Sequence, residues 1–296
     1  MAAEPIFRGV ATALITPFDE VGRIDWDAFG RLIEWQIAEG INGLVIAGTT
    51  GEGPTLTDEE HRQVFKFAME VSGHKVPMVA GTGSNDTAYA ISLTEYASEL
   101  GYDGMLVVTP YYNKATQNGL VRMYTEIAAH SAAPLILYNV PSRTGVNIEP
   151  ATYAAMADNP MIGAIKEANN NISKIVETVS LVGDRMTLYS GNDDQIVPIM
   201  AMGGQGVISV LSNVAPRQTV EICDKMFAGD VEDAAALQCK YMPLISALFC
   251  EVNPTPVKAA MAAAGWCKNV LRSPLYPMEP AHEAKILGIM KKLGLI

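Results

Sequence analysis

Short apolar runs recur along the chain, and a stretch with helical periodicity follows most of them. The runs are nearly continuous in hydrophobicity, which is typical of parallel strands buried on both faces. Repeated strand–helix units build either a barrel or an open doubly wound sheet. Eight runs, and no G-x-G-x-x-G motif after the first, favour an α/β fold of the (β/α)₈ TIM-barrel type. The predicted strands are residues 10–16, 43–47, 77–81, 105–109, 135–140, 162–166, 186–190 and 207–210.

The intervening helices have recognisable ends. Asp25 is placed to cap one helix and Gly40 to end it, and residues 57–60 (TDEE) form a capping box for another. After residue 229 the strand pattern stops, and helices are predicted over 230–251, 256–265 and 279–293. We therefore predict a catalytic barrel over residues 1–229 and a helical C-terminal region over residues 230–296.

Composition narrows the class of protein. The 296 residues are enough for one barrel of about 250 residues with an appendage. The net charge is −11 and Lys and Arg do not cluster, so we expect no binding of nucleic acid. The start of the chain, residues 1–5, lacks the pattern of a secretory signal, and no apolar stretch is long enough to span a bilayer. These features predict a cytoplasmic protein without a membrane anchor.

Cysteine and histidine give no sign of a metal site. The four cysteines lie in the last third without a C-x-x-C pair, so we predict reduced and mostly buried thiols. The four histidines are scattered, which predicts that neither residue type binds a metal.

The chemistry of a barrel lies at the C-terminal ends of its strands. Lys166 ends the sixth predicted strand. Burial there disfavours the ammonium form, so the pKa should fall and leave a free amine able to attack a ketone. From the lysine alone, an ion pair at the barrel mouth, with Glu167 as the partner, is an equally good interpretation.

Other strand ends offer groups for carboxylates. The turn Gly48–Gly51 (GTTG) could hold a small carboxylate on its backbone N–H groups, although an ordinary turn with a helix cap is the simpler interpretation. Arg143 offers a fork for a second carboxylate, or else an ion pair at a surface or interface.

Three hydroxyl groups are candidates for proton transfer. Tyr138, Tyr112 and Thr49 lie at strand ends and could form a relay near Lys166, although a single tyrosine in such a position is more commonly a packing residue. The acidic segment 192–194 (NDD) is interpreted as a helix cap rather than a metal site.

In their joint order, these segments resemble the superfamily of pyruvate-dependent class I aldolases that contains dihydrodipicolinate synthase and N-acetylneuraminate lyase. The resemblance runs from residues 12–18 (TALITPF) to 253–258 (NPTPVK) and 271–275 (LRSPL), almost the whole chain. Residues 111–113 (YYN) and 138–145 (YNVPSRTG) resemble the dihydrodipicolinate synthase family most closely. The sugar-acid lyases lack the arginine that matches Arg143.

The resemblance implies a reaction. Lys166 would form a Schiff base with pyruvate, and L-aspartate 4-semialdehyde would then condense with it to 4-hydroxy-tetrahydrodipicolinate, in the diaminopimelate route to lysine. No cofactor beyond the Schiff base is implied. The implied assembly is a homotetramer, a dimer of dimers, in which Tyr112 enters the neighbour's site. The implied roles are proton relay for Thr49, Tyr112 and Tyr138, pyruvate carboxylate binding for Thr49 and Thr50, aldehyde carboxylate binding for Arg143, and pocket lining for Gly191 and Ile208.

The resemblance also implies a regulatory pocket for L-lysine. Asn85 and Tyr111 keep the pattern of lysine-sensitive relatives, and His61 occupies another of the matching positions. Tyr89 stands where those relatives carry a carboxylate that pairs with the ammonium of lysine. Losing that contact should weaken binding by about 2–3 kcal/mol, so we predict weak inhibition by L-lysine or none.

Two other functions fit the same residues. A sister aldolase acting on a 2-keto-3-deoxy sugar acid or on hydroxy-oxoglutarate would share Lys166 and the Gly48–Gly51 turn. A non-catalytic, pyruvate-sensing barrel is an alternative of a different class.

Overall fold

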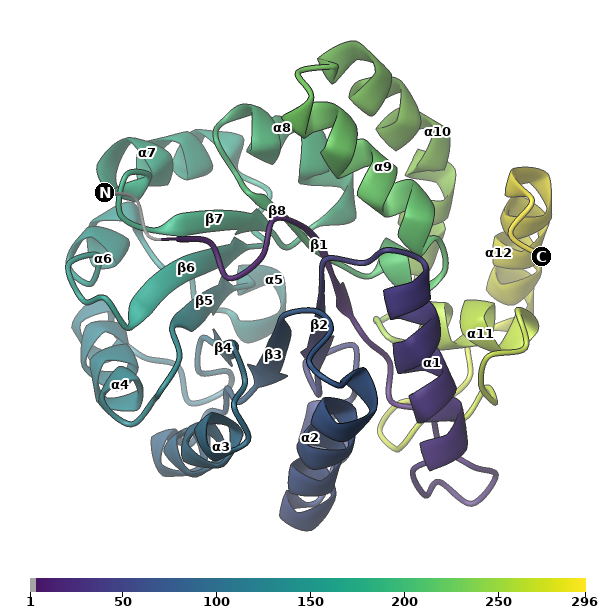
Figure 1. Ribbon diagram of the computed structural model, residues 1–296, viewed down its shortest axis with the longest axis horizontal. Coiled ribbons are helices and arrows are strands. Elements are labelled where there is room, and N and C mark those ends of the chain that lie inside the picture. Colours follow the sequence, from purple (N-terminus) through teal and green to yellow (C-terminus); the bar gives the residue numbers. More distant parts are fainter. Residues whose placement is uncertain (1–3) are drawn as a thin grey trace.

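Eight parallel strands pair in chain order and close into a barrel, because β1 pairs with both β2 and β8 (Figure 1). The computed structural model describes residues 4–296; residues 1–3, part of the start predicted not to be a signal, lie outside the described residues. The closed order of the eight strands confirms the predicted (β/α)₈ barrel. The strands are β1 Gly9–Ala13, β2 Gly43–Ile46, β3 Met78–Gly81, β4 Gly104–Val108, β5 Leu135–Asn139, β6 Ile162–Glu167, β7 Thr187–Ser190 and β8 Gly206–Ser209.

The first strand is shorter than predicted. It was expected to reach residue 16 but ends at Ala13, although the next residues remain buried. Beyond the sheet, the N–H of Ile15 donates to Asn213 Oδ1 at 3.1 Å, and the Thr16 hydroxyl donates to the Gly51 carbonyl at 2.7 Å. The apolar run therefore records burial, which continues after strand pairing has stopped.

Helices surround the barrel (Figure 1). The predicted caps are confirmed: Asp25 accepts from the N–H of Ala28, and Thr57 and Glu60 form a reciprocal capping box. Gly40 follows the first helix with φ +86°. The helices are α1 Trp26–Ala38, η1 Gly53–Thr55, α2 Asp58–Ser72, α3 Thr87–Glu99, α4 Gln117–Ala129, α5 Pro141–Thr144, α6 Pro150–Ala154, α7 Ile172–Val182, η2 Asp193–Gln195, α8 Ile196–Ala201, η3 Leu211–Asn213, α9 Pro216–Phe227, α10 Val231–Leu248, α11 Thr255–Ala263 and α12 Pro280–Leu293.

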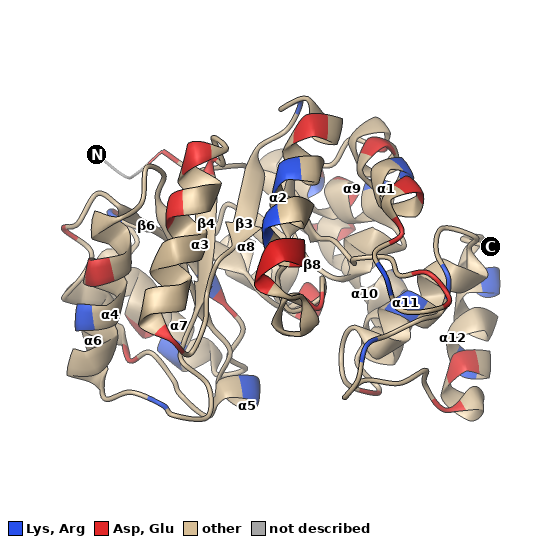
Figure 2. Cartoon of the chain, turned by 90° about the horizontal axis from the view of Figure 1, so that it is seen from below, with Lys and Arg blue, Asp and Glu red and all other residues tan. Residues whose placement is uncertain are grey.

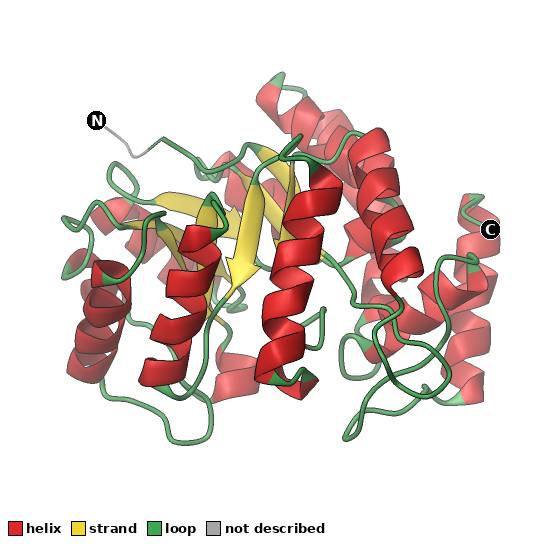
Figure 3. Ribbon diagram, turned by 60° about the horizontal axis from the view of Figure 1, so that its bottom comes forward, coloured by secondary structure: helices red, strands yellow, loops and turns green. Residues whose placement is uncertain are grey.

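Side chains fill the interior of the barrel and close its N-terminal end. Apolar and aromatic side chains, most of them from the strands, form one inner cluster, separate from the larger core between the sheet and the helices. Phe7 stacks on Tyr189 with ring centroids 4.2 Å apart, and the Tyr189 hydroxyl donates to the Phe7 carbonyl at 2.8 Å. The opposite end, toward which the arrow of the front strand points in Figure 3, is the end available for a site.

The predicted C-terminal helices are present as α10, α11 and α12, which lie beside α9 and α1 (Figure 1). Lys258 on α11 is fully buried and forms an ion pair with the buried Glu52, in the loop after β2. Its ammonium also donates to the Val270 carbonyl at 2.8 Å. Arg272 pairs at 2.6 Å with Glu60 in the first turn of α2, an acidic turn (Figure 2) of the kind that helix N-termini favour. The C-terminal region is therefore bound to the barrel through polar contacts, and the division at residue 229 stays a prediction.

The prediction of mostly buried cysteines is wrong. Cys223 is buried, but Cys239 and Cys250 are exposed and Cys267 is intermediate. Cys239 lies on α10 and Cys250 just after it, and both face solvent. The apolar character of cysteine therefore did not determine where these two side chains lie.

Among residues 4–296, no helix combines the length and apolar character needed to cross a membrane. No cluster of His, Cys, Asp and Glu suited to a metal ion occurs in the same residues.

Candidate active site

Lys166 projects into the barrel and Glu167 projects out of it, because side chains alternate along β6. Glu167 lies outside the strands, where it accepts hydrogen bonds from Asn139 Nδ2 at 2.9 Å and from the Tyr153 hydroxyl at 3.2 Å. The alternative in which Glu167 forms an ion pair with Lys166 is therefore wrong, since the two groups lie on opposite faces of the sheet.

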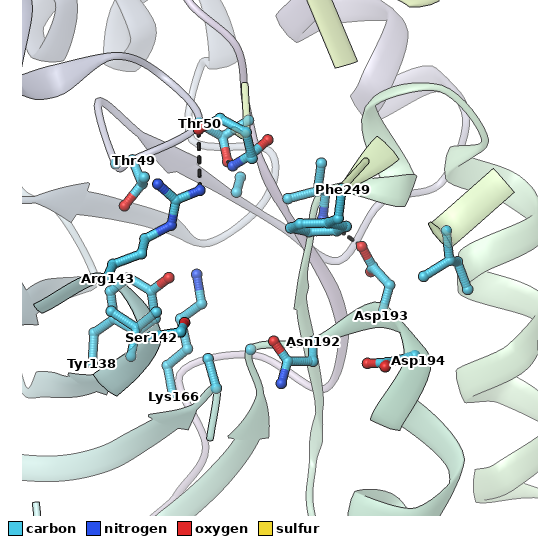
Figure 4. Close-up of a pocket in the computed structure, with 18 of the residues that line it drawn as sticks. Thr49, Thr50, Tyr138, Ser142, Arg143, Lys166, Asn192, Asp193, Asp194 and Phe249 are labelled. Atoms are coloured by element: carbon cyan, nitrogen blue, oxygen red, sulfur yellow. Dashed lines mark hydrogen bonds between the residues drawn. The ribbon is translucent and has the colours of Figure 1, made fainter. Parts of the chain in front are cut away.

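A cavity of about 440 Å³ opens at the C-terminal ends of the strands. Lys166, Tyr138 and Arg143 gather on one side of it, as Figure 4 shows, and residues from the C-terminal region form part of the wall. The predicted residues on its wall are Thr49, Thr50, Tyr138, Arg143, Lys166 and Gly191. Residues from the ends of four strands, β2, β5, β6 and β7, thus meet at one cavity.

The Lys166 amine is buried, with 5% of the residue exposed. Burial lowers its pKa from 10.5 to about 7; the Asp193 carboxylate acts in the opposite direction, and the Arg143 charge lowers the pKa further. No carboxylate pairs directly with Lys166 among the described residues. A large share of the amine is consequently neutral near pH 7, the form that attacks a carbonyl carbon.

Tyr138 is the neighbour of Lys166 across the sheet. The two residues are partners in the β5–β6 register, and Lys166 Nζ lies 4.1 Å from the centroid of the Tyr138 ring. Burial raises the pKa of Tyr138, while the Arg143 charge and a hydrogen bond with Thr49 lower it. Tyr138 therefore retains its proton near neutral pH and lies with Thr49 on the wall of the same cavity, an arrangement that suits proton transfer near the amine.

The Gly48–Gly53 loop presents donors to the cavity. The backbone N–H groups of Thr49 and Thr50 have no acceptor within residues 4–296, and Thr50 lines the cavity. The loop is tightly folded, since a Cβ on Gly53 would lie 2.3 Å from the Ala47 carbonyl oxygen, and Glu52 has φ +53°. Unpaired N–H groups beside hydroxyls are suited to a small carboxylate, one of the two interpretations that the sequence left open.

Arg143 extends over the mouth of the cavity from the short helix α5 (Figure 4). One of its terminal nitrogens donates to the Asn253 carbonyl at 3.1 Å, which leaves the rest of the fork without a carboxylate partner among the described residues. Arg143 is thus available for an anionic substrate group beside Lys166.

Tyr112 does not reach this cavity within its own chain. It is 93% exposed, and its backbone has φ +70°, an uncommon conformation for a tyrosine. The predicted relay of Tyr138, Tyr112 and Thr49 is therefore not brought together within one chain, since only Tyr138 and Thr49 line the same cavity. A tyrosine that belonged to a site built by one chain would be covered, whereas Tyr112 is exposed.

The remaining predicted residues are divided between the barrel interior and a second cavity. Ile208 is buried in the inner cluster and does not line the first cavity. His61 and Tyr111 line a neighbouring cavity of about 330 Å³, and Asn85 donates to the Tyr111 carbonyl at 3.2 Å. Burial lowers the pKa of His61 to about 4, so His61 is neutral there near pH 7.

Sequence reasoning missed the position of Asp193. Segment 192–194 was interpreted as a helix cap, but Asn192 forms no capping hydrogen bond with its side chain. Asp193 Oδ2 instead accepts from the N–H groups of Val210 and Leu211, at 3.0 and 2.8 Å, where β8 ends. Asp193 thus lies buried on the cavity wall as the main anionic influence on Lys166. Its place after the seventh strand was the signal available in the sequence.

Asn253 was also missed as a site residue. It precedes α11 and is 5% exposed, and its side-chain Nδ2 donates to Thr50 Oγ1 at 3.0 Å. Because the partners are separated by 203 residues, no local pattern links them.

Comparison with known proteins gives one consistent result. A profile of the Dihydrodipicolinate synthetase family matches residues 6–293. A 4-hydroxy-tetrahydrodipicolinate synthase of Exiguobacterium sp. is 50% identical over 289 residues, which cover 98% of this chain and 99% of the relative. The crystal structure of dihydrodipicolinate synthase from Thermotoga maritima has a TM-score of 0.96 at 42% identity, covering 99% and 100% of the two chains. The chloride-inhibited enzyme of Acinetobacter baumannii, determined in complex with pyruvate, has a TM-score of 0.95 at 40% identity, covering 98% and 99%.

Proposed function

The chain belongs to the dihydrodipicolinate synthetase family, and from this premise we propose that it condenses pyruvate with L-aspartate 4-semialdehyde to 4-hydroxy-tetrahydrodipicolinate. The reaction is a lyase-type step in the biosynthesis of lysine through diaminopimelate. We further propose that it takes place in the cytoplasm.

One observation carries the proposal. Lys166 is a buried amine with a pKa near 7, at the open end of a closed barrel, with Tyr138 against it and Arg143 over the same cavity. A neutral amine, a proton-transfer group and an anion-binding group together are the parts needed to activate a 2-oxo acid as an enamine.

The proposed reaction begins with pyruvate. Lys166 Nζ bonds to C2 of pyruvate, and the ketone oxygen takes up two protons and leaves as water, which gives the Schiff base. Loss of a proton from C3 converts it to an enamine. Tyr138 and Thr49 exchange these protons, since both residues line the cavity with the amine and Tyr138 lies directly against it. The Schiff base is the electron sink, so we propose that the reaction needs no metal or organic cofactor.

The second substrate supplies the aldehyde. C3 of the enamine bonds to the aldehyde carbon, and the aldehyde oxygen takes up a proton and becomes a hydroxyl. The amino group of the same substrate then bonds to C2, and Lys166 leaves as an amine. Arg143 is the proposed partner of the carboxylate of this substrate, because its free fork lies at the mouth of the cavity.

We propose that Tyr112 completes the relay in the site of a neighbouring protomer. Its exposure of 93% and its absence from the wall of its own cavity support a contact between chains. The proposed assembly is a homotetramer built as a dimer of dimers.

Borohydride reduction in the presence of pyruvate, followed by peptide mass spectrometry, tests the Schiff base. The expected result is a covalent adduct on Lys166 that is lost in Lys166→Met; an unmodified Lys166 in the active protein would overturn the proposal.

An assay with aspartate semialdehyde then tests the second substrate. Arg143→Ala should keep the adduct while kcat/KM for the aldehyde falls about 10–100-fold, the value of a hydrogen-bonded charge. Equal aldehyde kinetics in this variant would favour the sister aldolase.

A further inference from the structure

Asn253 connects the two groups that are proposed to bind carboxylates. Its side-chain Nδ2 donates to Thr50 Oγ1 at 3.0 Å, and its backbone carbonyl accepts from Arg143 at 3.1 Å, the bond drawn as a dashed line from Arg143 in Figure 4. Asn253 is 5% exposed and lines the cavity. A residue of the C-terminal region therefore lies between the pyruvate side and the aldehyde side of the site.

The side-chain contact determines how Thr50 can act. A threonine hydroxyl carries one proton and can also accept, whereas an amide nitrogen only donates. Since Asn253 Nδ2 donates to Thr50 Oγ1, the oxygen is used as an acceptor there and its proton remains available. Thr50 lines the cavity, so its hydroxyl can donate this proton into the cavity, beside the free N–H groups of the same loop.

The same amide carries a polar atom whose burial is costly to the fold. Asn253 Oδ1 is buried and has no hydrogen-bond partner in residues 4–296. A residue that only fills space would avoid a buried polar atom without a partner. The hydrogen bond that the nitrogen of the same amide donates to Thr50 gives a reason for the unsatisfied oxygen.

We propose that Asn253 is a positioning residue for the carboxylate of pyruvate: its amide occupies the acceptor side of Thr50 Oγ1 and directs the hydroxyl proton into the cavity. This inference rests on the proposed function. The aldehyde side is held differently, because Arg143 contacts the backbone carbonyl, which no side-chain substitution removes.

Asn253→Leu tests this role, because leucine has a similar shape and cannot donate. KM for pyruvate should rise about 5–10-fold, the loss of one ordinary hydrogen bond, while KM for aspartate semialdehyde stays within twofold. In a Thr50→Val background the same substitution should have no further effect on KM for pyruvate. Asn159→Leu is the matched control, since Asn159 is half-buried, accepts a hydrogen bond from the N–H of Met161 and does not line the cavity.

Three results would overturn the inference: an unchanged KM for pyruvate, parallel rises in KM for both substrates, or an undiminished effect of Asn253→Leu in the Thr50→Val background. If Asn253→Leu does not fold, Asn253→Asp keeps the question open to measurement, because its carboxylate accepts the Thr50 proton and should raise KM for pyruvate by more than tenfold. An unmodified protein that forms no adduct at Lys166 would refute the function and the inference together, whereas an adduct with unchanged pyruvate kinetics would refute the inference alone.

Discussion

Replacement of Lys166 by methionine should abolish catalysis and also stabilise the fold near neutral pH. Burial lowers the pKa of Lys166 from 10.5 to about 7, whereas in the unfolded chain the amine returns to its ordinary value. Each unit of pKa difference corresponds to ~1.4 kcal/mol. The unmodified protein therefore loses about 5 kcal/mol of folding free energy at neutral pH by holding this amine uncharged, a cost that methionine does not carry.

The pH dependence gives the prediction its sign. Between about pH 7 and 10.5 the unfolded chain binds a proton at Lys166 that the folded protein does not bind, so the stability of the unmodified protein rises with pH. The cost is fully present below pH 7 and disappears above the unfolded pKa. The advantage of Lys166→Met should therefore be greatest below about pH 7 and shrink by ~1.4 kcal/mol per pH unit above it.

Urea unfolding followed by tryptophan fluorescence measures this difference. The comparison should be made at about pH 6.5, 8 and 9 and at one fixed protein concentration, because assembly would add to the apparent stability. Lys66→Met is the matched control, since Lys66 is exposed on α2 and its side chain is 61% accessible. If Lys166→Met were no more stable than the unmodified protein at pH 6.5, or if the difference did not change with pH, Lys166 would not be a buried neutral amine.

Four other predictions follow from the site and its surroundings. The initial rate of borohydride trapping of pyruvate on Lys166 should rise about tenfold per pH unit below pH 7 and level off above it, because only the neutral amine attacks; a flat profile would contradict the lowered pKa. Tyr138→Phe keeps the ring beside the amine and removes the phenol, so kcat should fall about 10²–10⁴-fold with an unchanged urea midpoint; full activity would exclude Tyr138 from proton transfer. Lys258→Met leaves Glu52 buried without its cation and should lower the free energy of unfolding by about 3–5 kcal/mol. Adding Glu52→Gln should recover part of that loss, and no recovery would show that the ion pair is not the cause. L-Lysine should inhibit weakly in a steady-state assay and Tyr89→Glu should strengthen inhibition; tight inhibition of the unmodified protein would refute the reasoning.

Local sequence patterns predicted the barrel and the position of its lysine well. The apolar run that ends at Lys166 fixed a strand, and the alternation of side chains within that strand sends Lys166 inward and Glu167 outward. The alternation was visible in the sequence, but which parity faces the interior depends on the closed sheet. For this reason an ion pair between the two residues could not be excluded before the fold was known.

Contacts between distant segments could not be predicted in the same way. Asn253 meets Thr50 across 203 residues, and Asp193 meets backbone N–H groups that follow another strand. Such contacts arise from the packing of whole elements and leave no spacing to recognise. Tyr112 is a further case, since its proposed partners lie in another chain and its own chain leaves it exposed.

The return of the C-terminal region to the β2 loop has a consequence for synthesis on the ribosome. A nascent chain that has emerged only as far as residue 229 has all eight strands, but it lacks Lys258 to neutralise Glu52 and Asn253 to orient Thr50. The barrel can begin to assemble at that stage, while the loop proposed to bind pyruvate still carries an unpaired carboxylate. The helices after residue 229 thus complete the site proposed for pyruvate, and a chain that stops before them is expected to be inactive.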